Sequence, residues 1–225
     1  MIYNFTRGEF NLIMKIVVIG TGYVGLVTGT CLARYGNIVT CVDVDKERVK
    51  ILKSGVVPFY EPGLAEMMSR NMNEGRLFFT ESTHEALKDA EACFICVGTP
   101  DGSANLKYIE SAARDIGSGV QNKLLVVVKS TVPVGTNKKV ENWLNEELNK
   151  RNANIKIFMA SNPEFLREGS SLTDFLEPDR VIIGVRDQEA HEIFNNIYSF
   201  LDSSKLLFMN IPSAEMAKYA ANAML

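Results

Sequence analysis

The sequence predicts an α/β fold, with a doubly wound and mostly parallel sheet that is followed by the start of a long helix. Short apolar runs alternate with longer amphipathic segments over residues 14–210, which is typical of strands that alternate with helices. The first apolar runs are continuous, as expected of strands buried on both faces. A glycine-rich turn also joins the first expected strand to the first expected helix.

The expected elements follow in chain order, each strand being a short apolar run and each helix an amphipathic stretch between two such runs. Strands are predicted at 15–19 (KIVVI), 38–43 (IVTCVD), 76–80 (RLFFT), 92–97 (ACFICV), 123–128 (KLLVVV), 155–160 (IKIFMA), 180–185 (RVIIGV) and 204–209 (SKLLFM). Helices are predicted at 23–35, 45–54, 62–72, 82–89, 105–118, 136–150, 188–200 and 213–225.

The domain organisation follows from where this pattern begins and stops. Residues 1–13 are interpreted as an extension or a mis-assigned start, because the regular pattern begins at Met14. No Pro/Gly-rich linker interrupts residues 14–210, so one domain is predicted there. Residues 211–225 are expected to be the truncated start of a central connecting helix, since no Gly, Pro or polar tail ends the Ala-rich run.

Composition excludes several classes of function. Of the 225 residues, 46% are hydrophobic and 23% charged, with a net charge of −3, and the mixed charges predict no nucleic-acid partner. The longest apolar runs are too short to cross a bilayer, so no membrane partner is expected. The N-terminal residues lack the features of a secretory signal, and the reduced thiols predicted below fit a cytoplasmic protein.

The cysteines are predicted to be core residues. Cys93 and Cys96 have the spacing of a redox or zinc pair, but residues three apart on a strand point to opposite faces. No second Cys/His pair completes a zinc site, so no metal is expected. The two histidines, His84 and His191, have no obvious Ser or Cys partner, and a hydrolase triad is therefore not expected.

The glycine-rich turn, GTGYVG at 20–25, is a dinucleotide-binding motif between a strand and a helix. Gly20 permits the tight turn, Gly22 lets the backbone approach a pyrophosphate, and Gly25 lets the helix pack on the strand. Asp43 ends the next strand, 18 residues after Gly25, where a carboxylate binds the ribose hydroxyls and repels a 2′-phosphate. The motif predicts a Rossmann-type domain for NAD rather than NADP, with S-adenosylmethionine or a flavin as the alternative ligand.

Three later strand ends carry polar residues at the edge where ligands bind in doubly wound sheets. They are ICVGTP at 95–100, VVVKSTVPVGT at 126–136 with Ser130 and Thr131, and MASNPEFLREG at 159–169 with Glu164 and Glu168. The carboxylates of the third are candidates for acid–base work. The alternative is a set of ordinary turns, with Ser130 or Glu164 as a helix cap. Arg48 lies either along the adenine ribose or in solvent.

The motifs in order resemble the N-terminal half of the UDP-glucose/GDP-mannose dehydrogenase family. GTGYVG, ICVGTP, KSTVPVGT and SNPEFLREG are followed by EPDRVIIG at 177–184 and AEMAKYAANA at 214–223. The resemblance covers residues 14–225, and the forms STVPVGT and PDRVIIG are more similar to the UDP-glucose branch. Members of the family oxidise the C6 alcohol of a sugar nucleotide to a carboxylate with two NAD and one water.

The resemblance implies a role for each matching residue. The cofactor NAD would be bound by Gly20, Thr21, Gly22, Tyr23, Val24, Gly25, Asp43, Arg48, Val97, Gly98, Thr99, Pro100, Thr131 and Glu168. The nucleotide-sugar substrate would be held by Glu164, Phe165, Leu166, Arg167, Glu168, Lys218 and Asn222. Catalysis is assigned to Glu164, which activates water against a thioester, to Lys218, which stabilises the oxyanion near C6, and to Asn222 and Thr131. The full-length protein is expected to be a homo-oligomer.

The resemblance also raises a doubt about activity. The family's nucleophilic cysteine and second domain have no match in residues 1–225, so the chain is expected to be a fragment that binds NAD without completing the double oxidation. Three alternatives stay open: a dehydrogenase for GDP-mannose or another nucleotide sugar, a stand-alone NAD-binding module, and a hydroxy-acid dehydrogenase of the phosphogluconate type. The last two would leave NPEFLREG unexplained.

Overall fold

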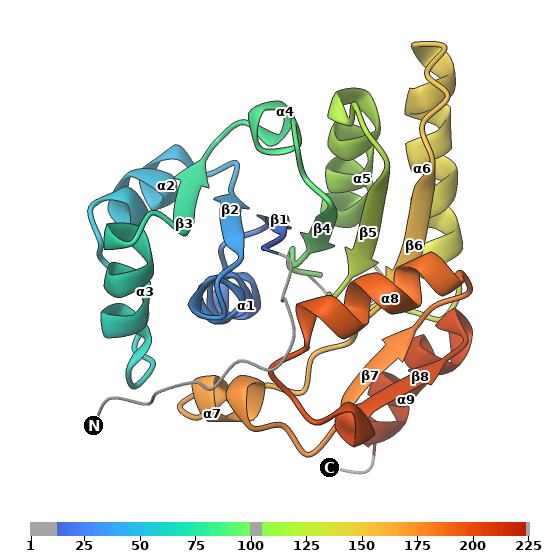
Figure 1. Ribbon diagram of the computed structural model, residues 1–225. Coiled ribbons are helices and arrows are strands. Elements are labelled where there is room, and N and C mark those ends of the chain that lie inside the picture. The colour runs from blue at the N-terminus through green and yellow to red at the C-terminus, as the bar shows by residue number, and fades with distance from the viewer. Residues whose placement is uncertain (1–12, 100–104, 224–225) are drawn as a thin grey trace.

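The structure, a computed structural model, describes residues 13–99 and 105–223, and within them the chain forms one eight-stranded sheet in the order β3-β2-β1-β4-β5-β6-β7-β8. Figure 1 shows helices on both sides of this sheet. The strands are β1 (Lys15–Ile19), β2 (Ile38–Val42), β3 (Leu77–Thr80), β4 (Ala92–Ile95), β5 (Leu124–Val128), β6 (Ile157–Ser161), β7 (Val181–Gly184) and β8 (Leu206–Met209). The predicted doubly wound, mostly parallel fold is confirmed.

The helices match the predicted positions with shifted ends. They are α1 (Tyr23–Arg34), α2 (Lys46–Lys53), α3 (Leu64–Asn73), α4 (Thr83–Ala86), α5 (Lys107–Gly119), α6 (Thr136–Lys150), α7 (Ser171–Leu176), α8 (Gln188–Ile197) and α9 (Ile211–Ala223), with a short 3₁₀ turn η1 (Ser203–Lys205). Helix α7 has no counterpart among the predicted helices, and the predicted helix 82–89 is reduced to the single turn α4. The last helix starts two residues earlier than predicted, because Asn210 accepts a hydrogen bond from the amide of Ser213 at 2.9 Å and so begins it.

The sheet reverses its strand order beside β1. β1 pairs with β2 on one side and with β4 on the other, in parallel register at both edges. The chain therefore winds outward in both directions from this point, where the carboxyl ends of β1 and β4 leave a crevice for a ligand. β6 and β7 make the only antiparallel pairing of the described sheet, through Ser161 and Gly184.

Two apolar layers fill the two faces of the sheet. Alternate residues of β1 separate into them, Ile16 and Val18 into the layer with α1, α3 and α8, and Val17 and Ile19 into the layer with α5 and α6. Among the described residues, no helix combines the length and apolarity that a bilayer crossing requires.

The cysteines are placed as predicted. All four are buried free thiols. Cys93 and Cys96, which have the spacing of a redox or zinc pair, lie in opposite apolar layers. Burial raises the pKa of Cys96 to about 12, so its thiol is protonated at neutral pH and is a poor nucleophile.

The expectation that the histidines lack a serine partner is wrong for His84. Its Nε2 lies 2.9 Å from Oγ of Ser118 on α5, a contact between residues that are distant in sequence. The Ser118 hydroxyl also donates to the main-chain oxygen of Asp115 at 3.0 Å, and neither His84 nor Ser118 lines the cavities around Glu164.

Candidate active site

The glycines of the loop between β1 and α1 have two kinds of surroundings, tight packing at Gly20 and Gly25 and open space at Gly22. A Cβ on Gly20 would lie 2.7 Å from the main-chain oxygen of Cys96, and one on Gly25 only 1.9 Å from the oxygen of Gly20. Gly20 also has a φ of +95°, which favours glycine. A Cβ on Gly22 would meet nothing within 4 Å. Gly22 therefore borders open space at the N-terminus of α1, where a phosphate fits.

Asp43 follows β2 and lies against this loop. Its Oδ2 accepts hydrogen bonds from the amide of Thr21 at 2.8 Å and from the Thr21 hydroxyl at 2.6 Å, while Oδ1 accepts from the amide of Asp45 at 3.0 Å. These donors hold the carboxylate beside the glycine-rich turn. Arg48 lies in the first turn of α2, half-buried, where its amide donates to the capping Asp45 at 3.1 Å.

The glycine loop and the three later strand-end loops meet around one cavity of about 230 Å³. Its lining consists of Gly22, Tyr23, Val24, Cys96, Val97, Gly98, Thr99, Ser130, Thr131 and Glu164. The Ser130 hydroxyl donates to the main-chain oxygen of Val97 at 2.6 Å, so it ties two loops together and does not cap a helix. Pro100, the last residue predicted in this turn, lies outside the described residues.

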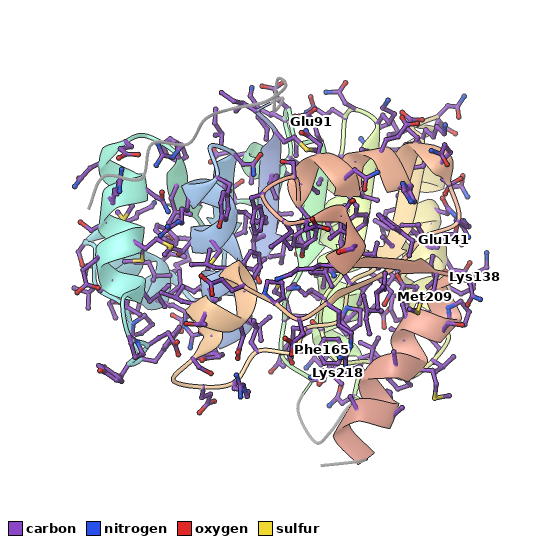
Figure 2. The ribbon with its side chains drawn as sticks, turned by 60° about the horizontal axis from the view of Figure 1, so that its bottom comes forward. Glu91, Lys138, Glu141, Phe165, Met209 and Lys218 are labelled. Carbon is purple, nitrogen blue, oxygen red and sulfur yellow. The ribbon has the colours of Figure 1, made fainter. Side chains whose placement is uncertain are left out.

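Glu164 and Lys218 form an ion pair at the side of this cavity. Oε1 of Glu164 lies 3.1 Å from Nζ of Lys218, and the two side chains are only 15% and 11% exposed. The other carboxylate oxygen accepts from the amide of Leu166 at 2.7 Å. Nζ of Lys218 also lies 5.0 Å from the centre of the Phe165 ring, and Figure 2 shows Phe165 and Lys218 side by side. The acid–base candidate and the cationic candidate are thus in direct contact.

Helix α9 carries Lys218 and is fixed to the loop that follows β5. Its buried Glu215 accepts hydrogen bonds from the amide of Gly135 at 2.7 Å and from the amide and the side chain of Asn137, both at 2.8 Å. Gly184 allows close approach on the other side, because a Cβ there would lie 2.7 Å from that of Ala214. Asn222 lies one turn beyond Lys218 in α9, and its side chain is outside the described part of the structure.

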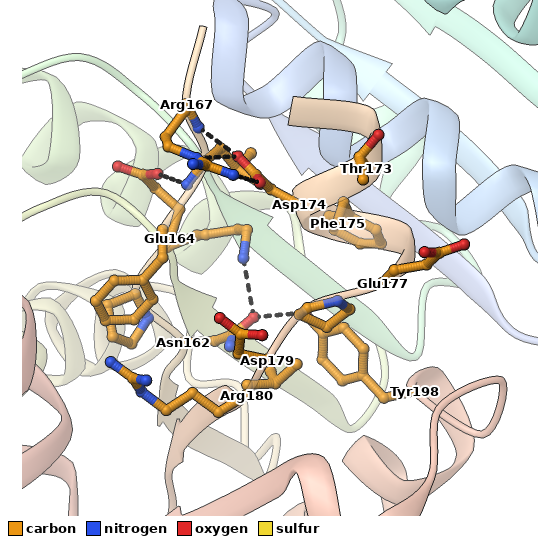
Figure 3. Close-up of a pocket in the computed structure, with 16 residues that line it drawn as sticks. Asn162, Glu164, Arg167, Thr173, Asp174, Phe175, Glu177, Asp179, Arg180 and Tyr198 are labelled. Carbon is orange, nitrogen blue, oxygen red and sulfur yellow. Dashed lines mark hydrogen bonds and ion pairs between the residues drawn. The ribbon is translucent and has the colours of Figure 1, made fainter. Parts of the chain in front are cut away.

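A second cavity of about 320 Å³ lies on the other side of Glu164. Figure 3 shows Asn162, Tyr198 and Glu164 along it. The buried Lys129 donates to Oδ1 of Asn162 at 3.1 Å, and the hydroxyl of Tyr198 donates to the same oxygen at 2.7 Å. Burial lowers the pKa of Lys129. This lysine is not among the predicted site residues, although a charge directly after the apolar run VVV is a usable signal.

The remaining predicted substrate residues lie in the loop after β6. Leu166 is half-buried and Glu168 is exposed. Arg167 is held away from the first cavity by Asp174, to which its side chain donates at 2.7 Å. Among residues 13–99 and 105–223, no three His, Cys, Asp or Glu side chains gather closely enough to hold a metal ion.

A family model matches most of this chain. Described as the UDP-glucose/GDP-mannose dehydrogenase family, NAD binding domain, it covers residues 14–202. The UDP-glucose 6-dehydrogenase of Pseudomonas aeruginosa is 47% identical over an alignment of 217 residues, which covers 94% of this chain and 48% of that protein. The enzyme of the same name from Rhizobium meliloti is 44% identical over an alignment of 220 residues, with coverage of 94% of this chain and 49% of that protein.

Solved structures give the same picture. A UDP-glucose dehydrogenase from the hyperthermophilic archaeon Pyrobaculum islandicum superimposes with a TM-score of 0.90 at 42% identity, covering 97% of this chain and 51% of that one. A ternary complex of GDP-mannose dehydrogenase from Pseudomonas aeruginosa gives 0.86 at 33% identity, covering 94% of this chain and 50% of that one. The chain spans about half the length of the curated relatives it matches.

Proposed function

We propose that this chain is the NAD-binding half of a UDP-glucose 6-dehydrogenase, because it belongs to the UDP-glucose/GDP-mannose dehydrogenase family. Such an enzyme oxidises UDP-glucose to UDP-glucuronate in two NAD-dependent steps. The observation that carries the proposal is the largely buried ion pair of Glu164 and Lys218 at 3.1 Å, beside a cavity that the glycine loop also lines. A domain that only binds NAD needs the dinucleotide motif but not such a pair, so the pair favours a catalytic assignment.

Within this proposal the dinucleotide site uses the residues predicted from the motif. The open space at Gly22 takes the pyrophosphate, which faces the first amides of α1. Asp43, held by Thr21 and Asp45, accepts from the ribose hydroxyls and repels a 2′-phosphate. Val97 and Thr131 line the cavity at the sheet edge. NAD, when bound there, accepts the hydride that leaves the substrate carbon.

The ion pair supplies the polar chemistry. The Lys218 ammonium is held in a largely buried place, where it stabilises negative charge on the oxygen at C6 more strongly than it would in water. That oxygen carries more charge in the transition state than in the ground state, so the contact accelerates the reaction. Glu164, beside the ammonium, accepts a proton from water in the hydrolytic step. Phe165 packs against the Lys218 ammonium and restricts its position.

UDP-glucose is preferred to GDP-mannose as the substrate because the relatives of that name are more similar. Identity is 47% with the UDP-glucose 6-dehydrogenase of Pseudomonas aeruginosa, but 33% with the GDP-mannose dehydrogenase whose structure was compared. The same proposal includes three further points. The full-length protein is a homo-oligomer, it is cytoplasmic, and its NAD-binding domain ends at residue 210, where the connecting helix begins.

Titration of the purified chain with reduced cofactors, followed by nicotinamide fluorescence, tests the cofactor part. We expect NADH to bind at least about tenfold more tightly than NADPH, because a carboxylate next to a 2′-phosphate is unfavourable by more than 1.4 kcal/mol. Asp43→Asn removes the charge but keeps the shape, so it should bring the two affinities within about threefold of each other. Equal binding of both cofactors by the unmodified chain would contradict this assignment.

The substrate part is tested by melting curves in the presence of NADH. UDP-glucose is expected to raise the melting temperature and GDP-mannose is not, because only a ligand that binds the folded state stabilises it. Lys218→Met should abolish the effect of UDP-glucose. Lys88→Met is the matched control, because Lys88 is an exposed lysine that precedes the amino end of β4, whereas the proposed site lies at the carboxyl ends of the strands. A response to GDP-mannose alone would reassign the substrate.

A further inference from the structure

A buried carboxylate outside the predicted site connects two of its loops. Glu61 lies between α2 and α3 and is 5% exposed. Its Oε2 is 2.6 Å from the hydroxyl of Tyr23 and accepts from the amide of Gly169 at 2.8 Å, while Oε1 accepts from the amide of Ser171 at 2.9 Å. Three donors from two distant parts of the chain thus converge on one side chain.

The first of these parts is the dinucleotide loop. Tyr23 is the first residue of α1 and lines the smaller cavity. Its ring packs on Phe59 with the centres 5.2 Å apart. Its hydroxyl has one proton and makes its shorter contact with Glu61, while the main-chain oxygen of Arg167 lies 3.0 Å away. A change at the N-terminus of α1 is therefore transmitted directly to Glu61.

The second part is the loop that carries the acid–base candidate. Glu164, Phe165 and Arg167 precede Gly169, whose φ of +86° allows the chain to turn toward Glu61. Ser171 then starts α7. Because the amides of Gly169 and Ser171 both point at the same carboxylate, Glu61 fixes the end of this loop.

The carboxylate is charged in this position. Burial acts to raise the pKa of Glu61, but the hydrogen bonds from Tyr23 and Gly169 outweigh it, and the pKa lies below its ordinary value. A charged acceptor forms stronger hydrogen bonds than a neutral one. Removing it leaves the buried amide of Ser171 without its partner and takes from the Tyr23 hydroxyl its shorter contact, so both loops are affected.

We propose that Glu61 is a positioning residue that couples the two ligand loops. NAD bound at the N-terminus of α1 fixes Tyr23. Through its hydrogen bonds, Glu61 then stabilises the loop ending at Ser171 in the conformation that holds the sugar nucleotide. The coupling rests on the proposed function of both loops. Because linkage is reciprocal, a sugar nucleotide held by the second loop also strengthens the binding of NAD.

Amide hydrogen exchange of the purified chain, with and without saturating NAD, tests the coupling. In the unmodified chain NAD should slow exchange at Gly169 and Ser171 by at least about fivefold, the lower end of common coupling energies. Tyr23→Phe keeps the bonds of Glu61 to both amides, so their protection without NAD should persist while the response to NAD is lost. Glu61→Ala should lose both the protection of these amides without NAD and the response to NAD. Glu66→Gln, at an exposed carboxylate of α3, is the control.

The conservative variant and the failures are also informative. Glu61→Gln keeps one acceptor oxygen and should restore part of the protection that Glu61→Ala loses. An equal response to NAD in the unmodified chain and in Tyr23→Phe overturns the coupling, and this variant decides the matter if Glu61→Ala does not fold. NAD binding without any change in exchange refutes the coupling but leaves the cofactor site intact. Failure of NAD to bind refutes the proposed function as well.

Discussion

Two glycines of the same loop should respond differently to alanine. Gly25→Ala places a Cβ 1.9 Å from the oxygen of Gly20 and 3.1 Å from Cβ of Cys96, so α1 must shift away from β1. Overpacking of this kind typically destabilises a protein by about 1–3 kcal/mol. At about 2–4 °C per kcal/mol for a chain of this size, the melting temperature should fall by roughly 2–12 °C.

Gly22→Ala is the matched variant, because it adds the same methyl group to open space. Gly22 has φ −66° and ψ −171°, which alanine adopts without strain, so the melting temperature should stay within about 2 °C. The methyl group would occupy the space proposed for the pyrophosphate, and NADH affinity should fall at least about tenfold.

The two variants are compared by thermal melting and by NADH titration. Gly22→Ala should lose affinity at nearly unchanged stability, and Gly25→Ala should lose stability first. An unchanged melting temperature in Gly25→Ala would show that α1 does not pack on β1 as described. Unchanged NADH binding in Gly22→Ala would show that the open space is not the cofactor's.

Two further predictions concern buried charges. Burial lowers the pKa of Lys129, so the folded chain binds fewer protons there than the unfolded chain. In denaturant melts, the stability of the unmodified chain should therefore rise relative to that of Lys129→Met as the pH increases toward the unfolded pKa of about 10.5. A stability difference that does not change with pH would refute this. Glu215 accepts hydrogen bonds from the amides of Gly135 and Asn137 and so caps the start of α6. Glu215→Gln should therefore be destabilised by about 1–2 kcal/mol in the same melts, whereas Glu146→Gln, at an exposed residue of α6, should not. Equal destabilisation of the two variants would contradict the capping role.

The fold could be predicted because its signals are local. The run KIVVI at 15–19, the turn that follows it and the next helix are adjacent in sequence, and each has one favoured structure. The same holds for Asp43, since the end of β2 follows from a local pattern. The opposite faces of Cys93 and Cys96 follow from strand geometry alone and are confirmed by their separate apolar layers.

The parts that were missed depend on distant partners. The six residues of α7 are too few to show a helical period, and its first amide is bound by Glu61, a residue 110 positions away. The antiparallel pairing of β6 and β7 has a single residue pair, and the side chain of Asn162 extends it by donating to the oxygen of Ile182 at 2.9 Å. Neither arrangement has a signal within its own segment.

In the candidate site, too, a residue whose role depends on distant partners could not be predicted from its own segment. In the sequence Lys218 is a lysine on an Ala-rich helix, a residue type that is mostly exposed, and only the family resemblance predicts a role for it. In the structure it is 11% exposed against Glu164. A charge is stable in that position only because a carboxylate from another loop accompanies it, and removing either partner leaves the other buried alone. The carboxylates of Glu61 and Glu215 obey the same rule with backbone amides as partners, so the charges that build this site are recognisable only once the chain has folded.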